Sequence, residues 1–132
     1  MLSKNKQIFI VDDDVSVCCA LSVLLVTYGF TVGTFTSTEE FFSAVSNSVP
    51  GCLILDIHMP GLDGWQALKR IIKPDSNRPV IIMSADRDEG LNERALKAGA
   101  VGYLQKPFND QALVDLIKVA VEKQSSTNKT SK

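Results

Sequence analysis

The sequence has 132 residues, of which 45% are hydrophobic and 22% charged, and its formal net charge is −1. The length suits one domain, and the composition is typical of a globular protein rather than a disordered or fibrous one. The near-neutral charge argues against a surface that binds nucleic acids or membranes through bulk charge. Five of the 14 Lys and Arg residues lie near the termini, however, so residues 7–122 carry 9 basic and 15 acidic side chains, a difference of −6.

We expect neither a targeting segment nor a membrane span. No run approaches the roughly 18 consecutive apolar residues that a membrane span requires, and residues 1–7 lack the long apolar region of a secretion signal. Cys18, Cys19 and Cys52 have neither metal-ligand nor redox spacing. We therefore expect buried, reduced thiols in a cytoplasmic protein.

The first half of the sequence predicts a strand, a helix, an edge strand and a second helix. Residues 8–11 form an uninterrupted apolar run, which is typical of a parallel strand buried on both faces. Residues 31–36 alternate between apolar and polar side chains and indicate an edge strand. Ser37 and Glu40 form a capping box, in which each side chain bonds the other's backbone N–H group. The apolar helix positions are Val17, Leu21, Leu24 and Leu25, and then Phe41, Phe42 and Val45.

The second half predicts three more strands, each followed by a helix, and the last two helices have recognisable ends. The apolar runs at residues 52–55, 80–83 and 101–104 are the strands. Gly99 is suited to a helix C-cap, and Asn109 can cap the last helix at its N-terminus. The apolar helix positions are Leu91, Ala95, Leu96 and Ala98, and then Leu113, Leu116, Ile117 and Ala120.

Five β-α repeats imply an α/β domain with a parallel sheet, helices on both faces and right-handed crossovers. We expect this domain over residues 7–122, after an N-terminal extension at residues 1–6. Residues 123–132 lack the apolar side chains needed for packing, and we interpret them as a disordered tail or the start of a linker.

Polar side chains follow four of the five predicted strands. Three aspartates at residues 12–14 follow the first strand, Asp56 ends the third, Ser84 ends the fourth and Lys106 follows the fifth. Ligands of open α/β sheets bind outside the carboxyl ends of the strands, so these side chains converge if the four strands are neighbours.

Grouped carboxylates repel one another, and a divalent cation removes this conflict. An all-oxygen site without Cys or His ligands favours Mg²⁺ or a similar hard ion. A metal beside an ammonium and a hydroxyl suits phosphoryl transfer, because metal and Lys neutralise the phosphoryl oxygens while one carboxylate attacks.

Five short motifs occur in order at the predicted strand ends. They are Val-Asp-Asp-Asp at 11–14, Leu-Asp-Ile-His-Met-Pro at 55–60 leading to Gly64, Met-Ser-Ala at 83–85, Ala-Gly-Ala at 98–100 and Tyr-Leu-Gln-Lys-Pro-Phe at 103–108. Together they resemble the receiver domain of bacterial two-component response regulators. The resemblance covers about residues 7–122. It implies the (βα)5 flavodoxin-like receiver fold, a doubly wound five-stranded parallel sheet in the order 2-1-3-4-5.

The resemblance implies a role for each matching polar residue. Asp56 would accept a phosphoryl group from the phosphohistidine of a sensor histidine kinase or a phosphotransfer protein. Asp13, Asp56 and the backbone carbonyl of His58 would hold Mg²⁺, and Asp12 would help through water. Lys106 would contact Asp56 and then a phosphoryl oxygen.

The resemblance also implies a switch. The Ser84 hydroxyl would bond another phosphoryl oxygen, and its movement would open space into which Tyr103 can turn. This would reshape the surface formed by helix four, strand five and helix five. The Lys106–Pro107 peptide bond would be cis. Such a protein is a phosphoacceptor signalling domain, not an enzyme, although it assists its own phosphorylation and dephosphorylation.

Simpler interpretations compete for several of these residues. Asp14 is better explained as a helix N-cap, and Trp65 as a packing residue. The side chain of His58 is expected to be exposed. Ser84 could be a plain strand-end hydroxyl, but its position favours a phosphate contact. The His58 and Asp86 side chains could tune the attack of water on the phosphoryl group, or simply be solvated.

A second class of function fits part of the sequence. The spacing of Asp12 and Asp14 resembles the Asp-x-Asp motif of haloacid-dehalogenase-like phosphatases, in which Asp12 would attack and Asp14 would be the acid. Against this, the chain is short, a second acidic metal motif is missing near its end, and Asp56 would lack a role. The aspartate that becomes phosphorylated distinguishes the two hypotheses.

The sequence leaves the output open. The domain could act alone on a separate protein, or be the N-terminal domain of a longer regulator. Residues 50–56 and 95–101 look like those of receivers joined to helix-turn-helix DNA-binding domains. The resemblance suggests a phosphorylation-dependent homodimer. We expect no membrane contact and no direct binding of nucleic acid, because the acidic domain would be repelled by phosphates.

Overall fold

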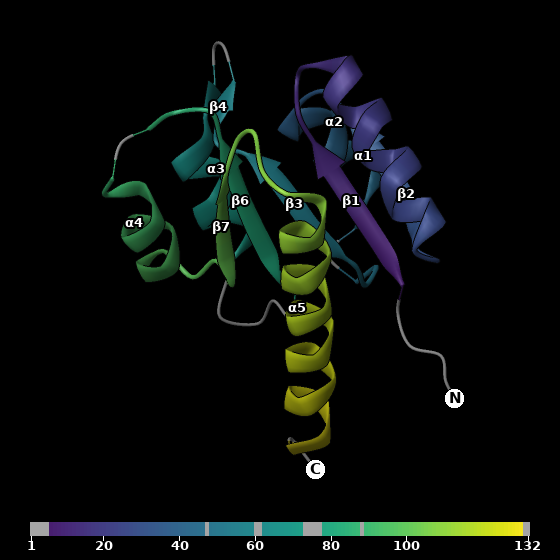
Figure 1. Cartoon of the computed structure of the whole chain (residues 1–132). Helices are drawn as coiled ribbons and strands as arrows, with labels where there is room; N and C mark the ends of the chain where they lie inside the picture. Colours follow the sequence, from purple (N-terminus) through teal and green to yellow (C-terminus); the bar gives the residue numbers. More distant parts are fainter. Residues whose placement is uncertain (1–5, 47, 60–61, 73–77, 88, 131–132) are drawn as a thin grey trace.

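A computed structural model describes residues 6–46, 48–59, 62–72, 78–87 and 89–130. Five strands in these ranges form a parallel sheet: β1 (Gln7–Val11), β2 (Thr31–Phe35), β3 (Cys52–Asp56), β6 (Val80–Ser84) and β7 (Gly102–Gln105). Their order across the sheet is β2-β1-β3-β6-β7 (Figure 1). Counted along the sheet strands alone, this is the expected order 2-1-3-4-5.

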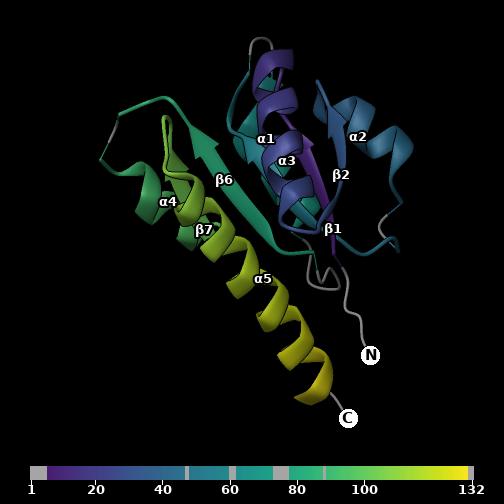
Figure 2. The same ribbon diagram turned by 45° about the vertical axis from the view of Figure 1, so that its right-hand side comes forward.

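Helices cover both faces of this sheet. Those in the described ranges are α1 (Val15–Thr27), α2 (Thr38–Ala44), α3 (Gly64–Ile71), α4 (Leu91–Lys97) and α5 (Asp110–Thr130). Helices α1 and α5 pack on one face, and α2, α3 and α4 pack on the other (Figure 1, Figure 2). The predicted doubly wound α/β architecture is therefore confirmed.

The side chains of each inner strand alternate between two apolar clusters. In β1, Ile8 and Ile10 point toward α1 and α5, whereas Phe9 and Val11 point toward the opposite layer. Strands β3 and β6 are buried along their whole length, while β2 is partly exposed, as its polar alternation predicts for an edge strand.

The ends of α4 and α5 match their sequence signals. Gly99 follows α4 with a φ of 108°, a conformation in which a side chain would be strained. Asn109 Oδ1 accepts hydrogen bonds from the backbone N–H groups of Gln111 and Ala112. Asn109 therefore caps α5, as predicted.

The capping box of α2 differs from the prediction in one bond. Ser37 Oγ accepts a hydrogen bond from the Glu40 N–H group, as expected. The Glu40 carboxylate, however, accepts from the N–H group of Thr36 at 2.8 Å instead of that of Ser37. Glu40 therefore holds the backbone of Thr36, the residue after β2, and does not form the second hydrogen bond of the capping box.

Three other features depart from the sequence-based expectations. A short antiparallel pair, β4 (His58–Met59) and β5 (Leu62–Asp63), follows β3. Two-residue strands are too short to give a periodic signal. Leu96, expected in the apolar stripe of α4, is 49% exposed, and Cys19, expected to be buried, is exposed. Both lie on outer helix faces.

Helix α5 extends past the predicted end of the domain. Its backbone is helical to Thr130, whereas the sequence predicts a disordered tail or the start of a linker from residue 123. An established helix propagates into polar residues at little cost, so helical backbone does not require the apolar side chains that packing needs. The expected extension at residues 1–6 lies almost entirely outside the described residues, and the domain limits remain a prediction.

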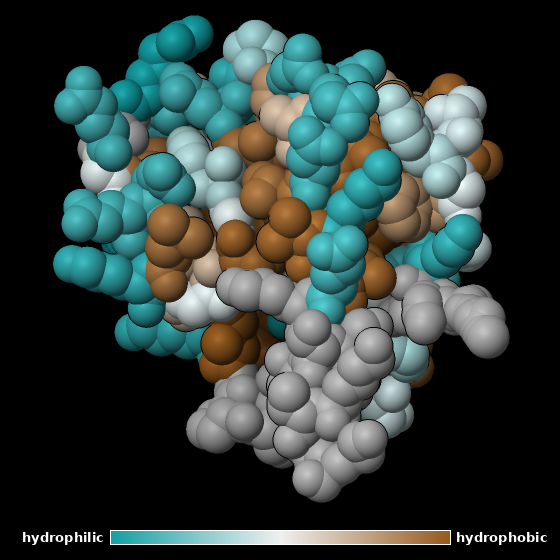
Figure 3. All heavy atoms as spheres, turned by 60° about the horizontal axis from the view of Figure 1, so that its bottom comes forward, coloured by the Kyte–Doolittle hydropathy of each residue, from teal (hydrophilic) through white to brown (hydrophobic). Residues whose placement is uncertain are grey.

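Apolar side chains gather on one part of the surface. Figure 3 brings the lower end of the molecule forward and shows apolar residues near the centre of this view, with hydrophilic ones toward its periphery. Among the helices that the structure describes, none combines the length and the apolar content that crossing a membrane would require.

Candidate functional site

The carboxyl ends of four neighbouring strands bring the predicted polar residues together. Strand β3 pairs with β1 and β6, and β6 pairs with β7, all in parallel. Asp12 follows β1 directly, Asp56 and Ser84 are the last residues of β3 and β6, and Lys106 follows β7. The convergence expected from the strand-end rule is therefore found at one edge of the sheet.

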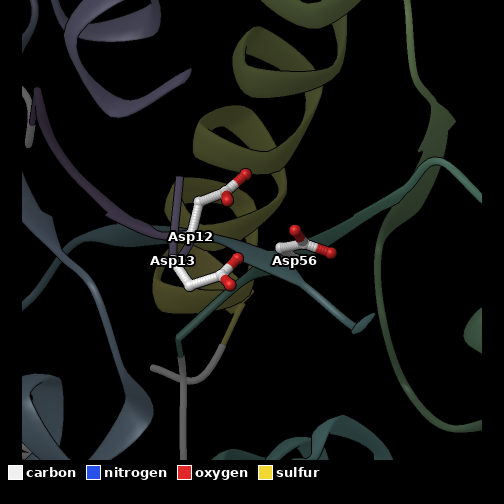
Figure 4. Close-up of side chains that lie close together, drawn as sticks. All are labelled: Asp12, Asp13 and Asp56. Atoms are coloured by element: carbon white, nitrogen blue, oxygen red, sulfur yellow. The ribbon is translucent and has the colours of Figure 1, made fainter. Parts of the chain in front are cut away.

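Three aspartates form an oxygen-rich cluster at this edge. Asp12, Asp13 and Asp56 each place a carboxylate oxygen within 4.8 Å of the other two (Figure 4). Asp12 is fully buried and Asp56 is 5% exposed, whereas Asp13 is open to solvent. A set of carboxylate oxygens with one open side fits a hard divalent cation such as Mg²⁺.

Lys106 bridges the two buried carboxylates. Its Nζ donates a hydrogen bond to Asp12 Oδ2 at 2.6 Å and another to Asp56 Oδ2 at 3.1 Å. Burial alone would lower the pKa of Lys106, but its hydrogen bonds and charge interactions with both aspartates outweigh burial and raise that pKa. The sequence predicts the contact with Asp56. It misses the shorter one with Asp12, because the reach of a side chain between loops leaves no sequence pattern.

Asp56 is held by one donor on each oxygen. Oδ1 accepts a hydrogen bond from the backbone N–H of His58 at 3.0 Å, and Oδ2 accepts from Lys106. Burial raises the pKa of Asp56 above the ordinary value of 3.8. The His58 N–H bond and the Lys106 charge oppose this rise, and the charge of Asp12 adds to it. The fold therefore fixes the position of this carboxyl group and still disfavours its ionisation.

Asp14 caps a helix, whereas the neighbouring Asp12 and Asp13 belong to the carboxylate cluster. Its carboxylate accepts hydrogen bonds from the Ser16 N–H group at 2.9 Å and from the Ser16 hydroxyl at 2.6 Å, and it caps α1. These bonds lower the pKa of Asp14. Its own N–H group donates to Asp12 Oδ1 at 2.9 Å. The N-cap interpretation is confirmed, and the turn orients Asp12.

The two predicted switch residues, Ser84 and Tyr103, both form a hydrogen bond with the backbone of Asp86. Ser84 is buried, and its Oγ accepts a hydrogen bond from the Asp86 N–H group at 2.9 Å. The half-buried Tyr103 donates its hydroxyl to the Asp86 carbonyl at 3.4 Å. Sequence reasoning identified Ser84 and Tyr103 but not the backbone that connects them.

His58 and Asp86 face each other at the rim of the site. His58 Nε2 lies 3.5 Å from Asp86 Oδ2, with the side chains 50% and 42% exposed. The expected exposure of His58 is confirmed, but the pairing across two loops was not predicted. The Lys106–Pro107 peptide bond is cis, as expected.

Comparison with known proteins identifies the domain. The chain matches the family model of the response regulator receiver domain over residues 8–118. It belongs to this family. The receiver domain is 37% identical over 120 residues to the transcriptional regulatory protein FixJ of Bradyrhizobium diazoefficiens, covering 91% of this chain and 58% of FixJ. It is 35% identical over 122 residues to the response regulator protein TodT of Pseudomonas putida, covering 92% of this chain and 54% of TodT.

Solved structures agree with this family assignment. The receiver domain superposes on the response regulator StyR with a TM-score of 0.86 at 34% identity, covering 97% of this chain and 65% of StyR. It superposes on the beryllofluoride-activated NtrC4 receiver domain dimer with a TM-score of 0.81 at 28% identity, covering 90% and 98%. The receiver domain spans little more than half of FixJ and TodT. None of these similarities supports the phosphatase alternative.

Proposed function

We propose that this receiver domain accepts a phosphoryl group on Asp56 from the phosphohistidine of a histidine kinase or a phosphotransfer protein, in a Mg²⁺-dependent reaction. The observation that carries the proposal is the placement of the Asp56 carboxylate. One oxygen lies 3.1 Å from Lys106 Nζ, within a cluster that also contains the oxygens of Asp12 and Asp13. A nucleophilic carboxylate beside fixed positive charge is what phosphoryl transfer requires.

In the proposed transfer, an Asp56 oxygen forms a bond to phosphorus while the P–N bond of the phosphohistidine breaks. The electron pair of that bond returns to the imidazole, which takes up a proton as it leaves. Lys106 Nζ moves from the carboxylate to a phosphoryl oxygen, as a compact ammonium on a flexible stem can. The Ser84 hydroxyl exchanges its loop contact for a second phosphoryl oxygen. The product is an acyl phosphate.

The charge balance of the cluster supports a cation. Asp12, Asp13 and Asp56 carry three negative charges when ionised and Lys106 carries one positive charge, which leaves two negative charges unbalanced. Asp13, Asp56 and the backbone carbonyl of His58 would hold Mg²⁺, with Asp12 helping through water. When bound, Mg²⁺ neutralises charge on the transferring phosphoryl oxygens.

We infer a signalling output rather than catalytic turnover. Movement of Ser84 would disturb the Asp86 backbone and free Tyr103 to turn, which would change the surface formed by α4, β7 and α5. FixJ is a transcriptional regulator of which the match covers 58%. This supports a DNA-binding region elsewhere in a longer cytoplasmic protein over a separate partner. The activated NtrC4 dimer supports a phosphorylation-dependent homodimer.

Labelling with acetyl phosphate tests the proposal. We expect wild-type protein to become phosphorylated with Mg²⁺ and not in excess chelator, and Asp56→Asn to remain unlabelled under both conditions. Asp14→Asn is the matched control, because Asn keeps the helix cap and should leave labelling unchanged. Normal labelling of Asp56→Asn, or of wild type in chelator, would contradict the proposal.

A further inference from the structure

Helix α4 is the shorter helical element of the proposed switch surface, by which we mean the surface formed by α4, β7 and α5. It has seven residues, and its buried side chains are Leu91 and Ala95. Leu96 is half exposed. A helix this short is not stable without tertiary contacts, so its position depends on its packing against the sheet and on the contacts at its edges.

One of these interactions joins α4 to α3. The guanidinium carbon of Arg94 lies 4.0 Å from the centroid of the Trp65 ring. This is well inside the distance at which a cation is attracted to the face of an indole, the aromatic ring that binds cations best. Trp65 is half-buried and packs against the apolar cluster beneath it, as predicted, so the ring is a fixed platform. Arg94 is the exposed partner that ties α4 to it.

The platform is also connected to the phosphoacceptor. Trp65 follows Gly64, and a Cβ added to Gly64 would lie 2.3 Å from the carbonyl oxygen of Ile57. Ile57 is the residue after Asp56. The start of α3 is therefore packed directly on the backbone next to the proposed site of phosphorylation. Helix α4 is also connected to the predicted switch, because the chain segment between β6 and α4 contains Asp86, whose carbonyl accepts the hydrogen bond from Tyr103 on β7.

We propose that Arg94 is a positioning residue whose contact with Trp65 holds α4 against α3 before phosphorylation and breaks when α4 shifts to its activated arrangement. The contact then sets how readily the switch surface responds to modification of Asp56. This inference rests on the proposed function. A contact present in one arrangement of α4 and lost in the other stabilises the first by its full strength. Removing the contact therefore makes the activated arrangement easier to reach, and ligands that favour that arrangement bind more tightly.

The test uses beryllofluoride with Mg²⁺ as the phosphoryl mimic, and measures binding by fluorine NMR and by tryptophan fluorescence. Trp65 is the single tryptophan of the chain, so its emission reports directly on this contact. For the wild type we expect saturable binding accompanied by a change in emission. For Arg94→Gln we expect about two- to fivefold tighter binding and a smaller change in emission, because no guanidinium leaves the ring. Arg94→Lys keeps a cation near the ring and should be closer to wild type.

Arg70→Gln is the matched control. The Arg70 guanidinium lies 3.9 Å from the centroid of Phe42, so this variant loses the same kind of contact between α3 and α2, away from α4. Its affinity for beryllofluoride should equal that of wild type. The inference is overturned if wild type binds without a change in Trp65 emission. It is also overturned if Arg94→Gln is less stable yet binds with wild-type affinity, which indicates a merely structural role. Absence of binding to wild type by fluorine NMR would instead contradict the proposed function.

Discussion

At the scale of single residues, Asp56 must be ionised to attack phosphorus although the fold disfavours its charge. Burial raises its pKa, and the contacts with His58 and Lys106 only partly offset this effect. The folded protein therefore binds the Asp56 proton more tightly than the unfolded chain does. Above the unfolded pKa, ionisation of Asp56 reduces the free energy of unfolding, and this penalty disappears as the pH falls through the folded and then the unfolded pKa.

We therefore expect Asp56→Asn to have a higher Tm than wild type at neutral pH in the absence of Mg²⁺. The difference should shrink as the pH falls, because the wild-type carboxyl becomes neutral as well. Thermal unfolding followed by circular dichroism across the acidic range measures both effects. Asp14→Asn should show no such gain, since hydrogen bonds from Ser16 lower the pKa of Asp14 and make its charge favourable. A lower Tm for Asp56→Asn at neutral pH would contradict the argument.

The cysteines give a second prediction at this scale. Burial raises the pKa of the Cys52 thiol to about 12, and burial also raises that of Cys18. Cys19 is exposed. Because the thiolate is the reactive form, an aromatic disulfide reagent should modify about one thiol quickly in the native protein and all three in denaturant. Cys19→Ser should remove the fast phase, and a fast phase that survives this change would show that the core opens readily.

At the scale of elements, the sequence predicts where helices and strands lie better than the exposure of every residue on them. In α1 the predicted apolar stripe is the packed one, since Leu21 and Leu25 are buried. In α4 the stripe fails at Leu96, which was expected to pack and is 49% exposed. A helix of seven residues has fewer than two full turns, so its apolar positions define the buried face poorly.

Gly64 is a case in which the sequence marks a residue without explaining it. The residue belongs to a receiver motif, and the structure supplies the reason, since a Cβ there would lie 2.3 Å from a backbone carbonyl oxygen that cannot move independently. We expect Gly64→Ala to lower the free energy of unfolding by about 1–3 kcal/mol. Gly102→Ala is the matched comparison, because its Cβ would meet the flexible end of Leu116 at 2.7 Å. Urea unfolding should show a clearly smaller loss for Gly102→Ala, and equal losses would contradict the distinction.

At the scale of the whole molecule, the regular alternation of strands and helices was sufficient to predict a parallel sheet. The strand order that makes its polar residues neighbours came from the resemblance to receiver domains. Parallel strands bring their carboxyl ends to one side whatever the details of packing. The bond between Lys106 and Asp12 and the approach of His58 to Asp86 were not predictable. Each depends on how far a side chain reaches across a gap between two loops, and neither loop conformation nor side-chain reach is periodic in the sequence.

The acidic surplus of the domain leads to the last prediction. Two negative charges remain unbalanced in the site when its three aspartates are ionised, so a cation that binds there should stabilise the folded protein over the unfolded chain. Ligand binding to the native state alone contributes about 2.7 kcal/mol at 100 times its Kd. We therefore expect the Tm of wild type to rise with Mg²⁺ concentration at constant ionic strength. Asp13→Asn should lose most of this rise, whereas Asp14→Asn, one residue away, should keep it. A Tm that is insensitive to Mg²⁺, or an equal rise in Asp13→Asn, would exclude these three carboxylates as the cation site.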